Sequence, residues 1–377
     1  MSDLRFIFSL AEFISSANRF PGTPHHLEVR KFLKTSLKGF GYLFTQKFGA
    51  ALQKPVSGRV EKDFFSFEGL PYTNSPSGKV WGKIADVGFG LPRENLGRSF
   101  EGKVILLKEG KLPFRKKEEF FKNKGARGII VYREEVDEIY AGISAGLLPV
   151  ISIKPSEARF LHEGDAVGVE VKTKPYEVEG ENICLELGEG DRVLYLIAHY
   201  DTKPNTPGAI DNGLSVALLV WLAGKLSRFE RKLRYRIRFL FTDLEEFGLL
   251  GAERFAEGIP QKELKKSIVI SVDTVGWRTP AILVRDGEGY NSPSLVEFCA
   301  EILEKLGKRE SFAFTVGSSG RSDHIPFRKR GARTLFFASN PFPYRHTPLD
   351  TFEIVDSFAV KHWMNFLSYF VKNVRWD

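Results

Sequence analysis

Two histidines and three carboxylates with the chemistry to bind metal ions follow short apolar runs or lie in a glycine-flanked loop. They are His199, Asp211, Glu246, Asp273 and His346. Imidazole and carboxylate ligands suit divalent zinc, with cobalt or manganese as alternatives. Five ligands exceed what one catalytic zinc takes, because such a site keeps an open position. The set therefore predicts two divalent ions that share one carboxylate, with Asp211, whose neighbouring glycines permit an unusual backbone, as the bridge.

Two further carboxylates lie beside these ligands. Glu245 directly precedes Glu246, and adjacent side chains at a strand end point to opposite sides. We therefore predict that Glu246 binds metal and that Glu245 is the general base. Asp201 follows His199 by two residues, and we expect it to accept the second imidazole N–H.

Each of these residues alone has an ordinary structural explanation. A Glu-Glu pair often begins a helix, where negative charge is favoured, and a single Asp or His after a strand is commonly a turn or surface residue. The ordered combination is far more specific than any member, and it predicts a metal-dependent catalytic site.

The elements that position these side chains are short apolar runs. Residues 193–198, 235–241, 267–272 and 335–338 are each bounded by polar residues, as is typical of buried parallel strands. Ligands of open α/β sheets bind outside the carboxyl ends of the strands, where the site residues would fall. The sequence predicts an α/β fold with a mixed, mainly parallel central sheet and helices on both faces.

The length of 377 residues favours two domains. A polar, turn-forming stretch at 73–78 precedes a region that is rich in strands and glycines but poor in clustered His, Asp and Glu. We predict one domain from residues 1–78 and 178–377, and a small β-rich insert at 79–177 without chemistry of its own. His25 and His26, in the first turn of a predicted helix, are interpreted as surface residues.

Composition excludes several classes of protein. The net charge is +8 and basic residues cluster between Lys225 and Arg238, but no recognition motif accompanies them, so nucleic acid is not an expected partner. Two cysteines form no disulfide framework, and no apolar run approaches the length of a membrane span. Charged residues at positions 3, 5 and 12 interrupt the apolar N-terminus, which is unlike a signal peptide. We expect a cytoplasmic protein that is not bound to a membrane.

The ordered motifs resemble those of the co-catalytic di-zinc aminopeptidases, a family that includes glutamate carboxypeptidase and the glutaminyl cyclases. The motifs are His199-Tyr-Asp201, Gly208-Ala-Ile-Asp211-Asn, Glu245-Glu-Phe-Gly-Leu-Leu-Gly251, Val272-Asp273 and His346-Thr-Pro-Leu-Asp-Thr351. The resemblance is strong over 178–377 and loose over 1–78, and residues 79–177 resemble a protease-associated insert.

This resemblance assigns His199 and Asp273 to one ion and Glu246 and His346 to the other. Asp211 would bridge the two ions and Glu245 would be the proton shuttle. It also implies a cis peptide bond after Asp211.

The implied function is an aminopeptidase acting on peptides with a free N-terminus. One alternative is a glutaminyl cyclase with a single zinc on Asp211, Glu246 and His346. A second is a carboxypeptidase, which would need cationic groups such as Arg321 and Arg345 to hold a substrate carboxylate. A third is a non-catalytic binding protein. The oligomeric state is left open.

Four residues are candidates for the substrate side of the site. Asp323 and His324 belong to a segment that resembles one lining the substrate in the family. His324 could also be read as a further ligand, but a substrate-side or structural role is favoured because the ligand set is already complete. Phe342 and Tyr344 are candidate walls of an apolar pocket, although aromatic residues in a proline-rich turn often serve packing.

Overall fold

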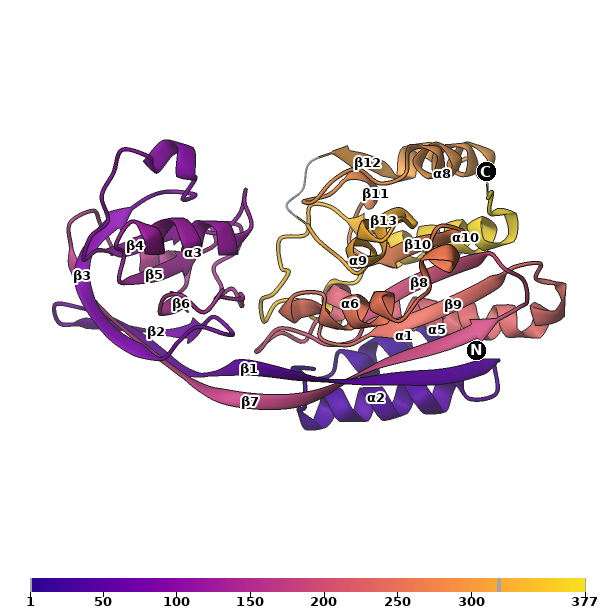
Figure 1. Ribbon diagram of the computed structural model, residues 1–377, viewed down its shortest axis with the longest axis horizontal. Coiled ribbons are helices and arrows are strands. Elements are labelled where there is room, and N and C mark those ends of the chain that lie inside the picture. The colour runs from indigo at the N-terminus through magenta and orange to yellow at the C-terminus, as the bar shows by residue number, and fades with distance from the viewer. Residues whose placement is uncertain (1, 317–319, 377) are drawn as a thin grey trace.

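The protein has a larger and a smaller lobe, joined by two long strands that run side by side (Figure 1). The computed structural model describes residues 2–316 and 320–376, without the side chains of residues 230–232. Arg231 and Lys232 of the basic cluster are therefore outside the described side chains.

The strands form one continuous set of pairings. They are β1 (Tyr42–Lys62), β2 (Phe65–Pro71), β3 (Gly78–Asp86), β4 (Val104–Lys108), β5 (Gly128–Tyr132), β6 (Val150–Ser152), β7 (Ala166–Leu187), β8 (Val193–His199), β9 (Arg236–Thr242), β10 (Ser267–Val272), β11 (Pro280–Arg285), β12 (Ala313–Val316) and β13 (Arg333–Ser339).

The sheet of the larger lobe has the order β1-β7-β9-β8-β10-β13-β11-β12. Its centre, β9-β8-β10-β13, is parallel, whereas β7 and β11 pair antiparallel with β9 and β13. Each predicted apolar run is one of the four central strands, and β8 and β10 are buried along their whole length. The prediction of a mixed, mainly parallel sheet is confirmed.

Helices cover both faces of this sheet. The α-helices are α1 (Asp3–Ile14), α2 (Pro24–Leu37), α3 (Phe114–Asn123), α4 (Pro155–Ala158), α5 (Leu214–Leu226), α6 (Leu250–Glu257), α7 (Gln261–Leu264), α8 (Pro293–Lys305), α9 (His324–Lys329) and α10 (Ser357–Asn373). Shorter helical turns are η1 (Pro92–Asn95), η2 (Ala209–Gly213), η3 (Ser227–Lys232), η4 (Glu245–Phe247), η5 (Arg309–Ser311) and η6 (Phe352–Ile354).

Alternate residues of β8 face opposite helical layers. Leu194 and Leu196 pack in the cluster that contains α1, α2, α5, α8 and α10, while Tyr195 and Ile197 pack with α6, α7 and α9. Within the described residues, the segment Ala209–Phe229 alone is long and apolar enough to cross a membrane, but 89% of its most apolar window is buried. Such burial is typical of a core helix, because a helix that is apolar on all sides must be covered on all sides.

The smaller lobe is a ring of strands, β1-β2-β6-β5-β4-β3-β7, closed by the pairing of β1 with β7. The strand β2 precedes the predicted insert 79–177, yet it pairs with β6 inside that range. The sheet of the smaller lobe therefore includes residues that precede residue 79.

A buried ionic network ties α2 to the sheet beside the predicted site. The carboxylate of Asp243 lies 2.9 Å from His26 Nε2 and accepts hydrogen bonds from Arg30 Nη2 at 2.9 Å and from the Tyr200 hydroxyl at 2.8 Å. Asp243 and His26 are fully buried. The interpretation of His26 as a surface residue is wrong, because the sequence does not show that α2 turns this histidine towards a buried acid.

Removing the shared acid should destabilise the fold strongly. We expect Asp243→Ala to lower the free energy of unfolding by about 3–5 kcal/mol, because it leaves buried cationic and polar partners uncompensated. Guanidinium denaturation followed by circular dichroism measures this change.

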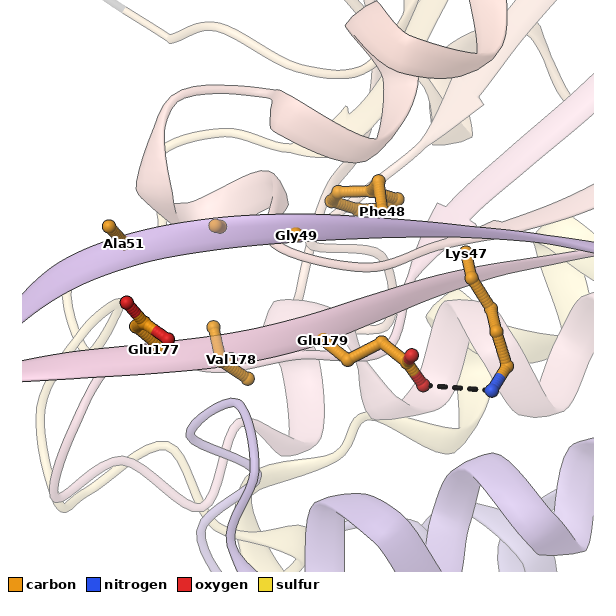
Figure 2. A pocket seen from close by; sticks show the side chains of 8 residues that line it. Lys47, Phe48, Gly49, Ala51, Glu177, Val178 and Glu179 are labelled. Carbon is orange, nitrogen blue, oxygen red and sulfur yellow. Dashed lines mark ion pairs between the residues drawn. The ribbon is translucent and has the colours of Figure 1, made fainter.

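The matched control is Glu179→Ala. Glu179 pairs with Lys47 on the exposed face of the β1–β7 ribbon at 2.9 Å, where the two side chains are 57% and 60% exposed (Figure 2). Water and salt screen such a pair, so its loss should leave stability nearly unchanged. Equal unfolding midpoints for the two variants would contradict the importance of the network.

Candidate active site

The six residues predicted as metal ligands or base converge at the carboxyl edge of the central strands. His199 ends β8, Asp273 directly follows β10, and Glu245 and Glu246 form the turn η4 after β9. The other two, Asp211 and His346, lie in η2 between β8 and α5 and in the loop after β13. This placement follows from parallel strands whose carboxyl ends meet at one edge of the sheet.

Their ligand atoms form two clusters that meet at Asp211. In the first, His199 Nε2 lies 3.2 Å from Asp211 Oδ1, 3.8 Å from Asp273 Oδ1 and 3.9 Å from Glu245 Oε2. In the second, His346 Nε2 lies 3.3 Å from Asp211 Oδ2 and 2.9 Å from Glu246 Oε2. The two carboxylate oxygens of Asp211 thus face different histidines.

This donor set fits divalent cations. Within each of the groups His199–Glu245–Asp273 and Asp211–Glu246–His346, the ligand atoms lie within 4.8 Å of one another. Three buried atoms at the centre, His199 Nε2, Glu246 Oε1 and Asp273 Oδ1, make no hydrogen bond within the described residues. Buried polar atoms are normally satisfied, so these atoms mark a place where a ligand belongs.

The loop that presents Asp211 is held by hydrogen bonds to buried charged residues. The Asp350 carboxylate accepts the backbone N–H groups of Ile210 and Asp211 at 2.8 and 3.0 Å, and the Arg19 guanidinium donates to the Gly208 carbonyl at 2.9 Å. Gly208 has a φ of +68°, and a Cβ there would lie 2.4 Å from the Asp211 carbonyl oxygen, so only glycine fits. The Asp211–Asn212 peptide bond is cis, as the resemblance implies.

The Asp201 carboxylate does not accept the hydrogen bond from His199 that the sequence predicts. Its backbone carbonyl, rather than its carboxylate, lies 3.2 Å from His199 Nδ1, and the carboxylate is farther away at 3.6 Å. The carboxylate oxygens accept the N–H groups of Glu245 and Glu246 at 3.1 and 3.2 Å. Asp201 therefore fixes the turn η4 that carries both glutamates.

Burial and neighbouring charged groups shift the pKa values of Glu245 and Asp211 in opposite directions. Burial raises the pKa of Glu245 well above its ordinary value, although His199 opposes this. Burial also acts on Asp211, but hydrogen bonds from His199 and His346 hold its pKa well below the usual range. Glu245 is therefore the more basic of these two carboxylates, as a residue that accepts a proton must be.

Ser322 is a neighbour of the site that sequence reasoning missed. Its hydroxyl donates to Asp273 Oδ2 at 2.6 Å and leaves Oδ1 facing His199. Serine is too common for its position in the sequence to signal this role.

The smaller lobe also reaches the site. The Tyr140 hydroxyl lies 3.0 Å from His346 Nδ1, and the backbone N–H of Ala141 donates to the His346 carbonyl at 2.9 Å. Arg133 donates to the carbonyl of Arg345 at 3.0 Å. The insert is predicted to have no chemistry of its own, and these contacts do not contradict that prediction. They show that its loop residues nevertheless hold the loop that carries His346, which lies far away in sequence.

A cavity of about 190 Å³, here called the site cavity, opens onto the two clusters. It is lined by residues of both lobes: Ile143, Asp211, Glu245, Glu246, Gly248, Leu249, Asp273, Thr274, Gly320, Arg321, Phe336, Arg345 and His346.

The candidate substrate residues are absent from that lining. Asp323 and His324 are fully buried, and they contact the Thr242 hydroxyl and the Asp286 carboxylate. These partners give both residues a structural role, which is one of the two roles expected of His324, and they contradict the alternative in which the two residues face substrate. Phe342 lines a neighbouring cavity, and Tyr344 packs edge-on against Trp277, 5.4 Å between ring centroids.

Comparisons with known proteins show a family that this chain matches. Residues 182–371 match the sequence model of Peptidase family M28. Aminopeptidase YwaD of Bacillus subtilis is 28% identical over 270 residues, which are 67% of this chain and 58% of the relative. The probable lipoprotein aminopeptidase LpqL of Mycobacterium tuberculosis is 26% identical over 352 residues, 84% of this chain and 69% of the relative. The chain thus spans less than two thirds of the length of YwaD.

Solved structures share the fold over nearly the whole chain. The zinc aminopeptidase BSAP from Bacillus subtilis has a TM-score of 0.77 at 23% identity, covering 97% of this chain and 93% of that one. A glutaminyl cyclase from an Acidobacteriales bacterium has a lower TM-score of 0.58 at 17% identity, covering 98% and 94%.

The contact between the lobes predicts an effect on metal affinity. If His346 Nε2 held a cation, the ring proton would be on Nδ1, which would donate a hydrogen bond to the Tyr140 oxygen 3.0 Å away and so fix the orientation of the ring. We expect Tyr140→Phe to weaken zinc binding about 10- to 100-fold, as loss of such partners does in other metal sites. Competition with a chromophoric zinc chelator measures the affinity.

The control is Tyr290→Phe, at an exposed tyrosine far along the chain from this contact. Zinc affinity equal to that of the unmodified protein in both variants would show that the smaller lobe does not position His346.

Proposed function

The chain belongs to Peptidase family M28, and from this premise we propose that it is a zinc-dependent aminopeptidase with two ions per site. The single observation that carries the two-ion proposal is the bridging geometry of Asp211, whose oxygens face His199 at 3.2 Å and His346 at 3.3 Å. The relatives named as aminopeptidases and the zinc aminopeptidase of the same fold support the activity and the metal.

The proposed ligand sets follow from the two clusters. One ion would be held by His199, Asp273 and Asp211, and the other by Asp211, Glu246 and His346. Bound there, the ions would polarise the scissile carbonyl and lower the pKa of a water molecule, so that the water could lose a proton near neutral pH and attack that carbonyl.

Glu245 is the proposed general base. It belongs to the same turn as Glu246 but lies on the His199 side, and no ligand role is required of it. Its carboxylate accepts the proton of the attacking water and passes it to the leaving amine. Asp201 contributes by fixing the backbone of this turn.

The size of the site cavity favours cleavage at a chain end. Its volume of about 190 Å³ lies below that of most small-molecule pockets, and Ile143 of the smaller lobe is part of its lining. Such a space accommodates a terminal residue better than the middle of an extended chain. The proposed substrates are therefore peptides with a free N-terminus.

A cyclase with one zinc is the less favoured alternative. In that case His199 and Asp273 would remain without an ion. Both residues instead present buried atoms that make no hydrogen bond within the described part of the chain, which favours a second ion.

Replacing the proposed base should separate catalysis from metal binding. We expect Glu245→Gln to lower kcat for leucine p-nitroanilide by about 10²- to 10⁴-fold, the contribution typical of general base catalysis. Zinc content, measured by mass spectrometry of metals, should stay at the level of the unmodified protein. Retention of full activity would remove Glu245 from the mechanism.

Metal stoichiometry tests the number of ions. We expect two zinc ions per chain after reconstitution, complete loss of activity after dialysis against a chelator, and recovery when zinc returns. His199→Ala should lower the content to one ion because the second cluster keeps all its ligands. A single ion in the unmodified protein would favour the cyclase.

A further inference from the structure

A second cavity adjoins the site cavity and shares part of its wall. Its volume is about 240 Å³. We call it the side cavity. The residues common to both cavities are Thr274, Gly320, Phe336 and Arg345. A ligand in the side cavity would therefore be separated from the site cavity only by these shared residues.

Three arginines line the two cavities, and two of them already have an acidic partner. Arg321 pairs with Glu288 at 2.7 Å, and Arg133 pairs with Glu135 at 3.1 Å. The guanidinium of Arg345 makes no hydrogen bond or ion pair within residues 2–316 and 320–376, although its backbone carbonyl accepts from Arg133. Arg345 thus supplies the uncompensated charge of the side cavity.

The carboxylates near Arg345 would not neutralise its positive charge if they held divalent cations. The Arg345 side chain is charged at neutral pH, because a guanidinium does not lose its proton in proteins. Divalent cations on these carboxylates would balance their negative charge. A partly buried guanidinium would then remain without a counter-charge, an arrangement that is costly unless an anion binds.

We propose that Arg345 binds a carboxylate of the substrate in the side cavity, so that the enzyme prefers peptides with an acidic group within reach. This inference rests on the proposed function and adds a substrate class to it. The guanidinium fork matches a carboxylate with two parallel hydrogen bonds. Leu283 and Phe342 supply apolar walls for the methylene groups that carry such a carboxylate.

Two parts of a peptide offer this chemistry. One is the side chain of an N-terminal glutamate or aspartate, and the other is the C-terminal carboxylate of a dipeptide. Two matched pairs of substrates distinguish them: glutamate and glutamine p-nitroanilides, and leucyl-glycine with its C-terminal amide.

We expect the acidic member of one pair to have a kcat/KM about 10- to 100-fold higher, mainly through KM, as loss of a charged hydrogen bond predicts. Arg345→Gln should abolish this preference, and Arg345→Lys should keep part of it because the charge remains without the fork. Arg115→Gln, at an exposed arginine of the smaller lobe, removes the same charge elsewhere and should leave the preference intact. Absence of preference in both pairs, or a preference that persists in Arg345→Gln, overturns the inference.

A binding measurement separates this inference from the proposed function. Calorimetric titration of the same four compounds into zinc-loaded Glu245→Gln protein, with and without Arg345→Gln, reports affinity without turnover. Zinc content of each variant shows whether the neighbouring His346 still binds its ion. Tighter binding of the acidic member, lost with Arg345→Gln, supports the carboxylate site even if no peptide is cleaved. Equal affinity for the acidic and the neutral member of both pairs contradicts the carboxylate site, even if leucine substrates are cleaved.

Discussion

The mutual repulsion of buried carboxylates is the constraint on which this structure depends. Asp201, Asp211, Glu245, Glu246 and Asp273 are all buried within one small region. Burial without compensation would cost several kcal/mol for each charge, so every acid must be paired, neutralised or bound to a cation. The carboxyl edge of the sheet meets this demand with backbone N–H groups, two histidines and open ligand positions.

The need to compensate these buried charges also explains residues that do not line the site cavity. Arg19 is fully buried among the backbone carbonyls of the loop that carries Asp211. Burial raises the pKa of Asp350 to about 8, with Asp211 adding to the effect, and this carboxyl group accepts two backbone N–H groups. These residues fix the position of Asp211, the proposed bridge, without an ion, and such preorganisation favours selective metal binding.

Residues at strand ends can be predicted from the sequence, whereas contacts between distant segments cannot. His199, Glu246 and Asp273 are identifiable because apolar runs mark the strands that carry them. Tyr140 and Ser322 are not, because their partners lie 206 and 49 residues away and neither residue type is diagnostic. The burial of His26 is hidden for the same reason, since its partner, Asp243, is 217 residues distant.

The pairing of β1 with β7 has a consequence for how the protein can vary in size. The chain leaves the larger lobe along β1 and returns along β7, and the two antiparallel strands are aligned from Tyr42 opposite Glu186 to Glu61 opposite Gly168. Chain added to or removed from the far end of this ribbon leaves the spacing of the central strands unaltered, and with it the separation of the ligands. Related sequences can therefore have a larger or a shorter smaller lobe, provided that its loop still contacts His346.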